Sequence, residues 1–447
     1  MKYLFDFDSE LIGSGERGRT FLELSSGRMI GLDPEALKSW LKELYNLSNR
    51  ELFWTPNLSK ELLDVAKLYL NDVELAMDCF NLALTGQHPE VFIQAIDVAM
   101  SFSLEAQEVA CENIFKAYPL ESHEQALRDR RSLVRLMAVQ SLPRFGDAAL
   151  PVLIFALKDS DNTILHACLD GLGVLGSSGV LGEIEPFVGA EYDEATRVRA
   201  LKALGKINAP SSLLVIEEAL RDFSTSVKIS ALESISAIDG EESFELLRKV
   251  FPDFAGTPLE SSYQRALFAR GAAATRNILR PYLLSENNLL AKRSTLQVGM
   301  VGEPAATPVL IANLLSTPRS TELLDALVSC TGVDFRKTPD PAGTYRAWWS
   351  AQQETLPRDW LRNSLVEKGF ELDQYFDDPL RCEPSKACEQ LLAALISGPP
   401  RLRPLVCYFL YTISNVDAQV ILPGTPESEL LRRAQPWQEF LNEIDGA

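Results

Sequence analysis

Three histidines are the side chains of this sequence best suited to proton transfer or metal binding near neutral pH. His88 lies in a Gly-Gln-His-Pro stretch that predicts a turn, and His123 precedes Glu124 in the only His-Glu dipeptide. His166 falls on a predicted helix. A metal site needs several ligands close together, and each of these histidines stands alone. We therefore predict no metal site and no catalytic residue.

The cysteines and the sequence motifs give no stronger indication of chemistry. Seven cysteines are an odd number, no Cys-x-x-Cys occurs, and the closest pair, Cys382 and Cys388, has no histidine nearby. Free cysteine is among the most buried residue types, so we expect buried, reduced thiols. The Gly-x-x-x-x-Gly-Lys-[Ser/Thr] loop and the Gly-x-Ser-x-Gly motif are missing from the sequence. Residues 13–18, Gly-Ser-Gly-Glu-Arg-Gly, have the Gly-x-Gly-x-x-Gly spacing, but a strand is predicted after them and not the helix that a dinucleotide-binding loop opens. We expect no cofactor.

The net charge narrows the classes of partner. The 447 residues include 43 Lys and Arg against 62 Asp and Glu, a formal charge of −19, and the acidic excess extends along the whole chain. Nucleic acids and anionic lipids attract basic surfaces, so we predict neither as a partner. The apolar run at residues 405–413 is far below the roughly 20 residues of a membrane helix, and the N-terminus turns acidic too early for a signal peptide. We expect a cytoplasmic protein that binds another protein, including a partner with an acidic patch.

The elements that must position any site are predicted by an internal repeat. Four segments align on a small residue, and large apolar residues lie four before, four after and seven after it, apart from Thr196 in the third segment. This spacing marks one face of a helix. A second apolar helix and acidic or serine-rich residues follow each time, and such short pairs must stack to bury a core. The sequence predicts an all-α, right-handed α-solenoid. Its anchors, at intervals of 30, 32 and 31 residues, are Ala138, Cys168, Ala200 and Ala231.

A resemblance to a known family is carried by these units. Residues 197–207, Arg-Val-Arg-Ala-Leu-Lys-Ala-Leu-Gly-Lys-Ile, resemble the short HEAT-like repeat first associated with phycobilin lyases. The resemblance extends over residues 129–253, with weaker copies on both sides. Downstream, a Thr-Gly-Val-Asp-Phe turn at 331–335 and the pair Trp348-Trp349 resemble the ending of many bacterial HEAT-repeat proteins. The two tryptophans are open to two interpretations, an aromatic docking spot or a cap that seals the last repeat.

Three parts of the chain are predicted. Residues 1–85 are expected to form a small N-terminal cap module, with two short strands near residues 3–7 and 20–24 followed by helices. Residues 86–356 form the HEAT-like solenoid. Residues 357–447 are expected to continue the array as a C-terminal helical extension without the regular period.

The function that this resemblance implies is a protein-interaction scaffold or adaptor, with no catalysis evident. A polar ridge on the repeat helices is the predicted partner-binding surface, and it consists of Arg144, His166, Arg199, Lys202, Lys206 and Glu233. The alternative is a phycobilin-lyase-like enzyme or chaperone-like factor that acts on a tetrapyrrole-carrying protein. A HEAT-like DNA glycosylase ranks last because it needs a basic channel. Deoxyhypusine hydroxylases resemble the architecture but need several His-Glu pairs, and this chain has one.

Overall fold

A computed structural model describes residues 34–47, 55–370 and 384–445, and every regular element in these ranges is a helix. The all-α prediction is therefore confirmed for the described part of the chain. The two strands predicted near residues 3–7 and 20–24 lie outside the described residues. The chain divides into two compact units, Met1–Ile184 and Glu185–Ala447. The three-part division proposed from the sequence stays a prediction.

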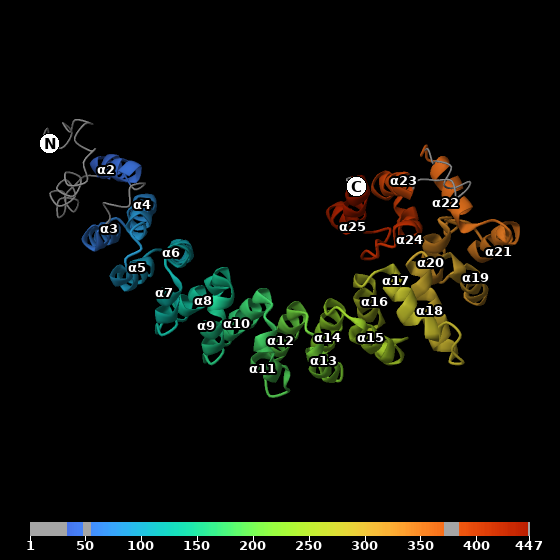
Figure 1. The fold of residues 1–447 in the computed structure, drawn as a ribbon, viewed down its shortest axis with the longest axis horizontal. Helices are drawn as coiled ribbons and strands as arrows, with labels where there is room; N and C mark the ends of the chain where they lie inside the picture. Colours follow the sequence, from blue (N-terminus) through green and yellow to red (C-terminus); the bar gives the residue numbers. More distant parts are fainter. Residues whose placement is uncertain (1–33, 48–54, 371–383, 446–447) are drawn as a thin grey trace. The chain divides into compact units, whose positions relative to one another are not determined.

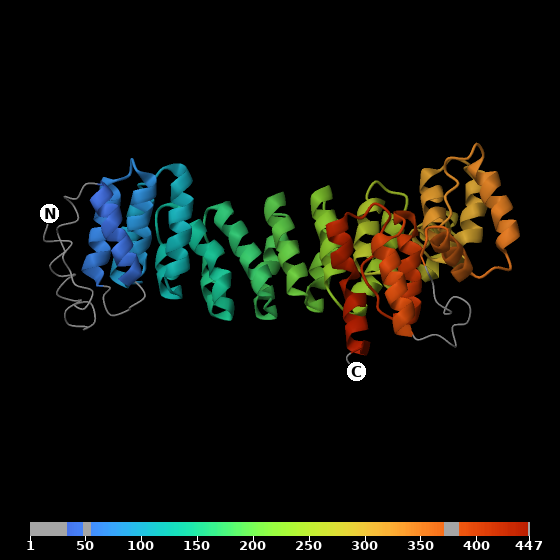
Figure 2. The same ribbon diagram turned by 90° about the horizontal axis from the view of Figure 1, so that it is seen from above.

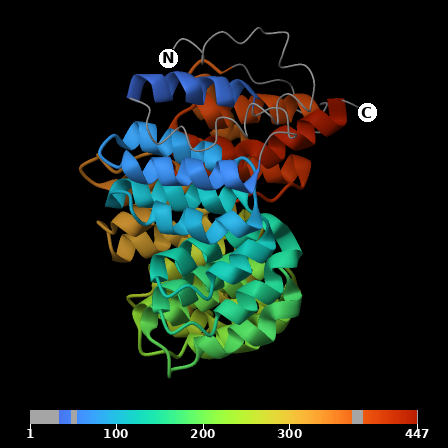
Figure 3. The ribbon, with the colours of Figure 1, turned by 90° about the vertical axis from the view of Figure 1, so that its left-hand side faces the viewer.

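The first unit is a stack of antiparallel helix pairs (Figures 1 and 2). One layer forms by contacts of α4 with α6, α6 with α8, and α8 with α10, while α3 and α5 pack against them from the other layer. Figure 3 shows the helices at the N-terminal end of this unit side by side, where α2 and α3 both contact α4. The helices are α2 (Pro34–Leu47), α3 (Pro56–Leu68), α4 (Val73–Leu84), α5 (Phe92–Ala99), α6 (Leu104–Ala117), α7 (Leu120–Ala126), α8 (Ser132–Ser141), α9 (Leu150–Ala156), α10 (Asn162–Leu175) and α11 (Leu181–Ile184).

The second unit continues with the same kind of pair. Helix α14 lies between α12 and α16 in one layer, and α13 and α15 lie in the other. The helices are α12 (Glu194–Ile207), α13 (Leu213–Ala219), α14 (Thr225–Ala237), α15 (Glu241–Phe254), α16 (Glu260–Ala269), α17 (Ala272–Leu279), α18 (Asn288–Met300), α19 (Thr307–Ser316), α20 (Thr321–Thr331), α21 (Pro341–Gln352), α22 (Pro357–Val366), α23 (Pro384–Ser397), α24 (Arg403–Ser414) and α25 (Glu427–Asp445).

The predicted anchors lie in the core of these stacks. Ala138, Cys168, Ala200 and Ala231 are all completely buried. The acidic and serine residues between the repeats cap the helix that follows. Asp161, Asp193 and Ser224 each accept a backbone N–H of the first turn of α10, α12 and α14, respectively. Such caps satisfy donors that a helix cannot satisfy itself. The small anchors let neighbouring repeat helices of each compact unit pack closely, and the caps fix where each helix begins.

The C-terminal helices contact earlier helices of the second unit. Helix α24 packs against α20 and α17, and α23 and α25 complete a separate core in which Trp437 is buried. Asp417, just after α24, accepts the backbone N–H groups of Ala273 and Ala274 at the start of α17, at 3.1 and 3.0 Å. These contacts bring the C-terminal helices beside earlier helices of the second unit. The interpretation of residues 357–447 as a C-terminal helical extension of the array stays a prediction.

Candidate interaction surface

The predicted ridge residues are divided between the two units. Arg144 and His166 belong to the first, and Arg199, Lys202 and Lys206 belong to α12 of the second. Glu233 lies on α14, the helix that packs beside α12 in the same layer. The α12 residues are three and four positions apart, which places them on one face of the helix. Lys202 and Lys206 are exposed, and Arg199 is half-buried.

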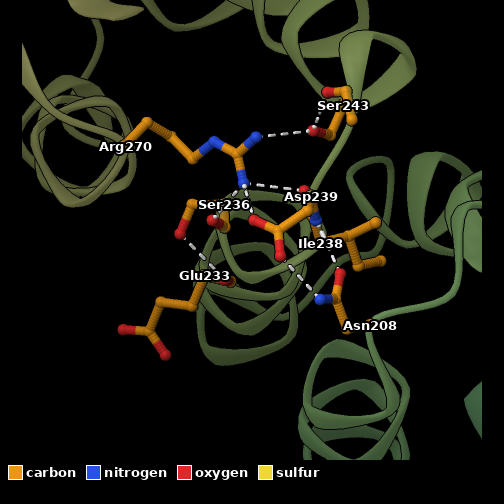
Figure 4. Close-up of polar contacts among 8 residues, drawn as sticks. Asn208, Glu233, Ser236, Ile238, Asp239, Ser243 and Arg270 are labelled. Atoms are coloured by element: carbon orange, nitrogen blue, oxygen red, sulfur yellow. Dashed lines mark hydrogen bonds and ion pairs between the residues drawn. The ribbon is translucent and has the colours of Figure 1, made fainter. Parts of the chain in front are cut away.

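The two lysines of α12 have no neighbouring carboxylate as a partner. Neither ammonium group forms an ion pair or hydrogen bond with any residue in the described ranges. Glu233 occupies on α14 the position equivalent to Lys202 on α12, 31 residues earlier. Its side chain points away from the polar contacts at the end of α14 (Figure 4). Within the described residues, the surface of α12 and α14 thus presents the unpaired ammonium groups of Lys202 and Lys206 beside the carboxylate of Glu233.

Helices α12 and α14 are held together beneath this surface by side-chain contacts with the backbone. Ser234 of α14 donates a hydrogen bond to the carbonyl of Leu201 at 2.8 Å, and Ser230 donates to the carbonyl of Val198 at 3.3 Å. A Cβ on Gly205 would lie 2.9 Å from the Cα of Ser234. The two helices therefore approach each other as closely as their backbones permit.

A ladder of polar side chains joins the C-terminal ends of three successive repeat helices (Figure 4). Asn208, at the end of α12, donates its amide N–H to the Asp239 carboxylate at 2.7 Å and accepts the backbone N–H of Asp239 at 2.6 Å. Arg270, at the end of α16, donates to the carbonyls of Ser236 and Ile238 at 3.0 and 2.7 Å. Its Nη1 also lies 3.5 Å from Asp239. We name Asn208, Asp239 and Arg270, spaced by 31 residues, the end ladder.

Arg144 has the same role in the first unit that Arg270 has in the second. Its guanidinium donates to the carbonyls of Lys116 and Tyr118 at 2.6 and 2.7 Å, at the end of α6, and stacks 4.4 Å from the centre of the Phe145 ring. Arg270 stacks over Phe244 in the same way, at 4.3 Å. These bonds satisfy carbonyls that a helix end leaves open. The guanidinium of Arg144, predicted as a partner contact, is thus engaged within the chain.

A second group of arginines ties the two helices of one repeat together. Arg197 of α12 pairs with Asp222 after α13, with 3.1 Å between Nε and Oδ2. Arg135 of α8 pairs with Asp159 after α9, at 2.7 Å. All four side chains are at least four-fifths buried. The sequence analysis placed these aspartates only among the acidic residues that follow each helix pair and missed the pairing, although the spacing from arginine to aspartate, 24 and 25 residues, recurs.

His123 and the described thiols are placed for packing. His123 is fully buried between Phe115 and Phe145, and its Nδ1 donates to the carbonyl of Pro119 at 2.9 Å. Burial lowers the pKa of His123. Six cysteines are free and buried in the described residues, and burial raises their pKa to about 11 or 12. No group of three potential metal ligands comes together within the described ranges. The described helices include none that is both long and apolar enough to cross a membrane.

Comparison with known proteins places the repeat in a family. Residues 196–222, which contain α12 and α13, match the family model described as the PBS lyase HEAT-like repeat. The chain is a HEAT-like repeat protein. A comparison with curated proteins gives no match.

Several solved structures are similar to this chain at low identity. The complex of CpcE and CpcF of phycocyanin lyase from Nostoc sp. PCC7120 is 20% identical over 54% of this chain and 94% of that chain, with a TM-score of 0.30. The karyopherin Kap121p bound to the SUMO protease Ulp1p is 11% identical over 97% of this chain and 62% of that one, with a TM-score of 0.41. An engineered protein is 15% identical over 99% of this chain and 97% of that one, with a TM-score of 0.30.

Proposed function

We propose that this chain is a protein-interaction scaffold and that the exposed face of α12 binds an acidic segment of a partner protein. The observation that carries the proposal is the pair Lys202 and Lys206, exposed and without ion pairs within the described residues, in a chain with a net charge of −19. Arg199, on the same face, extends the basic strip. Acidic residues outnumber basic ones throughout the chain, so unpaired lysines on one face are well suited to attract an acidic partner.

The bracing of α12 supports the same proposal. Its Arg197–Asp222 pair, its close packing on α14 and the end ladder hold the helix at both ends. A rigid helix binds a partner without an additional cost for ordering its own backbone. We propose Glu233 as a neighbouring residue that sets which basic groups of a partner are accepted, whereas Arg144 contributes through the stability of α6 and α8.

A matched pair of charge reversals tests this proposal. Lys202→Glu with Lys206→Glu reverses the α12 face, and Lys158→Glu with Lys292→Glu makes the same change at two other exposed lysines. We expect the first variant to lose the proteins that the wild-type chain captures from its native host, and the second to retain them. Capture should weaken as salt is raised, because exposed charges are screened. Equal capture by both variants would contradict the assignment to α12.

A phycobilin-lyase-like activity is the second candidate, and the match of residues 196–222 to the PBS lyase HEAT-like repeat is the observation in its favour. The chain would act on a tetrapyrrole carried by another protein. Adding a bilin to the purified protein should then shift the bilin absorbance to longer wavelength. An unchanged spectrum, with or without an acceptor protein, would remove this candidate.

A further inference from the structure

A cavity of about 390 Å³ lies in the C-terminal part of the second unit, apart from the α12 face. Its wall includes Trp348 of α21, Trp360 and Asn363 of α22, Asp334 after α20 and Arg401 before α24. This volume is within the range of small-ligand pockets, roughly 300–1,000 Å³. Four separate elements therefore supply two indole rings, an amide and an arginine to one space.

The indole of Trp360 is fixed in the wall of the cavity by its aromatic neighbours. Its ring centre is 5.2 Å from that of Trp348 and 5.9 Å from that of Trp349, in edge-to-face arrangements. Such pairs are favourable beyond the area they bury. Trp360 is only 5% exposed, so its N–H cannot turn toward bulk solvent without breaking this packing.

Two buried donors in this wall have no acceptor in the part of the chain that the structure describes. Within the described residues, neither the indole N–H of Trp360 nor the Nε–H of Arg401 has a hydrogen-bond partner. The Arg401 guanidinium also forms no ion pair among them. A buried donor without a partner is unfavourable, and more so when it is charged. A ligand that supplies acceptor oxygens would remove this cost at both groups.

The carboxylates near the cavity limit the charge of such a ligand. Asp334 is already bound by Arg336, with Nη2–Oδ2 and Nε–Oδ1 distances of 2.7 and 2.9 Å. Glu367, the other acidic group of the wall, is exposed. Arg401 also lies close enough to Asp334 to contribute to the lowered pKa of that carboxyl, but it forms no ion pair with it within the described residues, so its guanidinium is the positive charge that the wall offers to a ligand. This balance favours a ligand with one negative charge over a dianion such as phosphate.

We propose that this cavity binds a carboxylate whose neighbouring group is apolar, with Arg401 and the Trp360 N–H as the donors and Trp348 as the apolar wall. The two possible sources are the free C-terminus of a peptide and a small organic acid. The site is independent of the α12 face, so failure of one proposal leaves the other standing.

Nuclear magnetic resonance of the indole N–H groups in the full chain tests the site directly. The sequence has six tryptophans, and Trp360→Phe identifies the signal of Trp360. N-acetylphenylalanine should shift that signal downfield as the N–H gains an acceptor, and N-acetylphenylalaninamide should not. The peptide Gly-Ser-Ala-Phe with a free C-terminus indicates a peptide ligand if it binds more tightly than N-acetylphenylalanine, and a small acid if it does not.

Two arginine variants separate binding from a change in folding. Arg401→Gln should weaken binding of the acid about 10- to 100-fold, the loss expected for one charge-assisted contact. Arg346→Gln, on the exposed surface of α21, should leave it unchanged. Equal shifts by acid and amide, no shift by any probe, equal loss in both variants, or tighter binding of phenyl phosphate than of the acid would each overturn the proposal.

Discussion

The close approach of α12 and α14 makes Gly205→Ala a sharp test of the packing argument. In a helix interior, replacement of glycine by alanine ordinarily stabilises by about 1 kcal/mol. Here the new Cβ would lie 2.9 Å from the Cα and 3.0 Å from the Cβ of Ser234. Because the nearest atom belongs to the backbone, no side-chain rotation relieves the contact and the two helices must separate.

The magnitude follows from these two opposing effects. Overpacking of a core costs about 1–3 kcal/mol, and the upper part of this range applies where the backbone itself must move. After subtraction of the helix-propensity gain, we expect Gly205→Ala to lower the free energy of unfolding by about 1–2 kcal/mol. Urea unfolding, followed by circular dichroism and by tryptophan fluorescence, measures the change as a lower midpoint at constant slope.

Two other helical glycines provide matched controls. A Cβ on Gly171 of α10 would meet its nearest neighbour, a Leu153 methyl carbon, at 3.4 Å, and one on Gly182 of α11 would meet nothing within 4 Å. Alanine should therefore be neutral or stabilising at both, by up to about 1 kcal/mol. If Gly205→Ala is as stable as these controls, the backbone contact between α12 and α14 does not limit their approach and the reasoning is refuted.

Two further predictions concern buried polar groups. Arg270→Met keeps the bulk over Phe244 but removes the donors to two carbonyls, so we expect it to lower the free energy of unfolding in urea by about 3 kcal/mol. The control Arg265→Met loses one contact with Ser262 and should cost under about 1 kcal/mol. Equal costs for the two variants would contradict the capping role of Arg270. Burial lowers the pKa of His123 below the 6.5 of an unfolded chain, so the unfolded state binds the proton first as the pH falls. Stability should then decrease below about pH 6.5, by at most about 1.4 kcal/mol per pH unit, down to the lowered pKa of the folded state. His123→Phe should remove this part of the pH dependence, and an unchanged profile would show that another group causes it.

Local patterns in the sequence predict the repeat helices well. The anchors Ala138, Cys168, Ala200 and Ala231 follow from helical periodicity and small side chains, and all are buried. Asp161, Asp193 and Ser224 follow from the preference of these residue types for helix starts. Each of these features depends on residues that are close in sequence, so one sequence is sufficient to locate them.

The sequence could not predict contacts between residues that are far apart in the chain. Asp417 binds backbone groups 143 and 144 residues earlier, and no periodicity connects the two positions. The C-terminal helices therefore could not be placed on α17 in advance. The same is true of the cavity, where Trp360 and Arg401 reach one space from different elements.

The sequence could predict only part of the candidate surface. Lys202 and Lys206 follow from helical spacing, but their lack of ion-pair partners within the described residues depends on the whole surroundings. Arg144 is of a residue type that often contacts partners, yet its guanidinium donates hydrogen bonds to backbone carbonyls at the end of α6. An arginine in a repeat protein can serve either purpose, and only its neighbours in space distinguish them.

The end ladder also bears on how repeats with similar faces find their correct neighbours during folding. Repeat helices bury much the same apolar stripe, so hydrophobic contact alone would tolerate a skipped or exchanged unit, a characteristic failure of repeat proteins. The rungs differ chemically, because the carboxylate at 239 accepts from the amide at 208 and lies 3.5 Å from the guanidinium at 270. If α12 met α16 without α14, Asn208 and Arg270 would face each other with no carboxylate between them. The ladder thereby favours the observed order of these three repeats over one in which α14 is skipped.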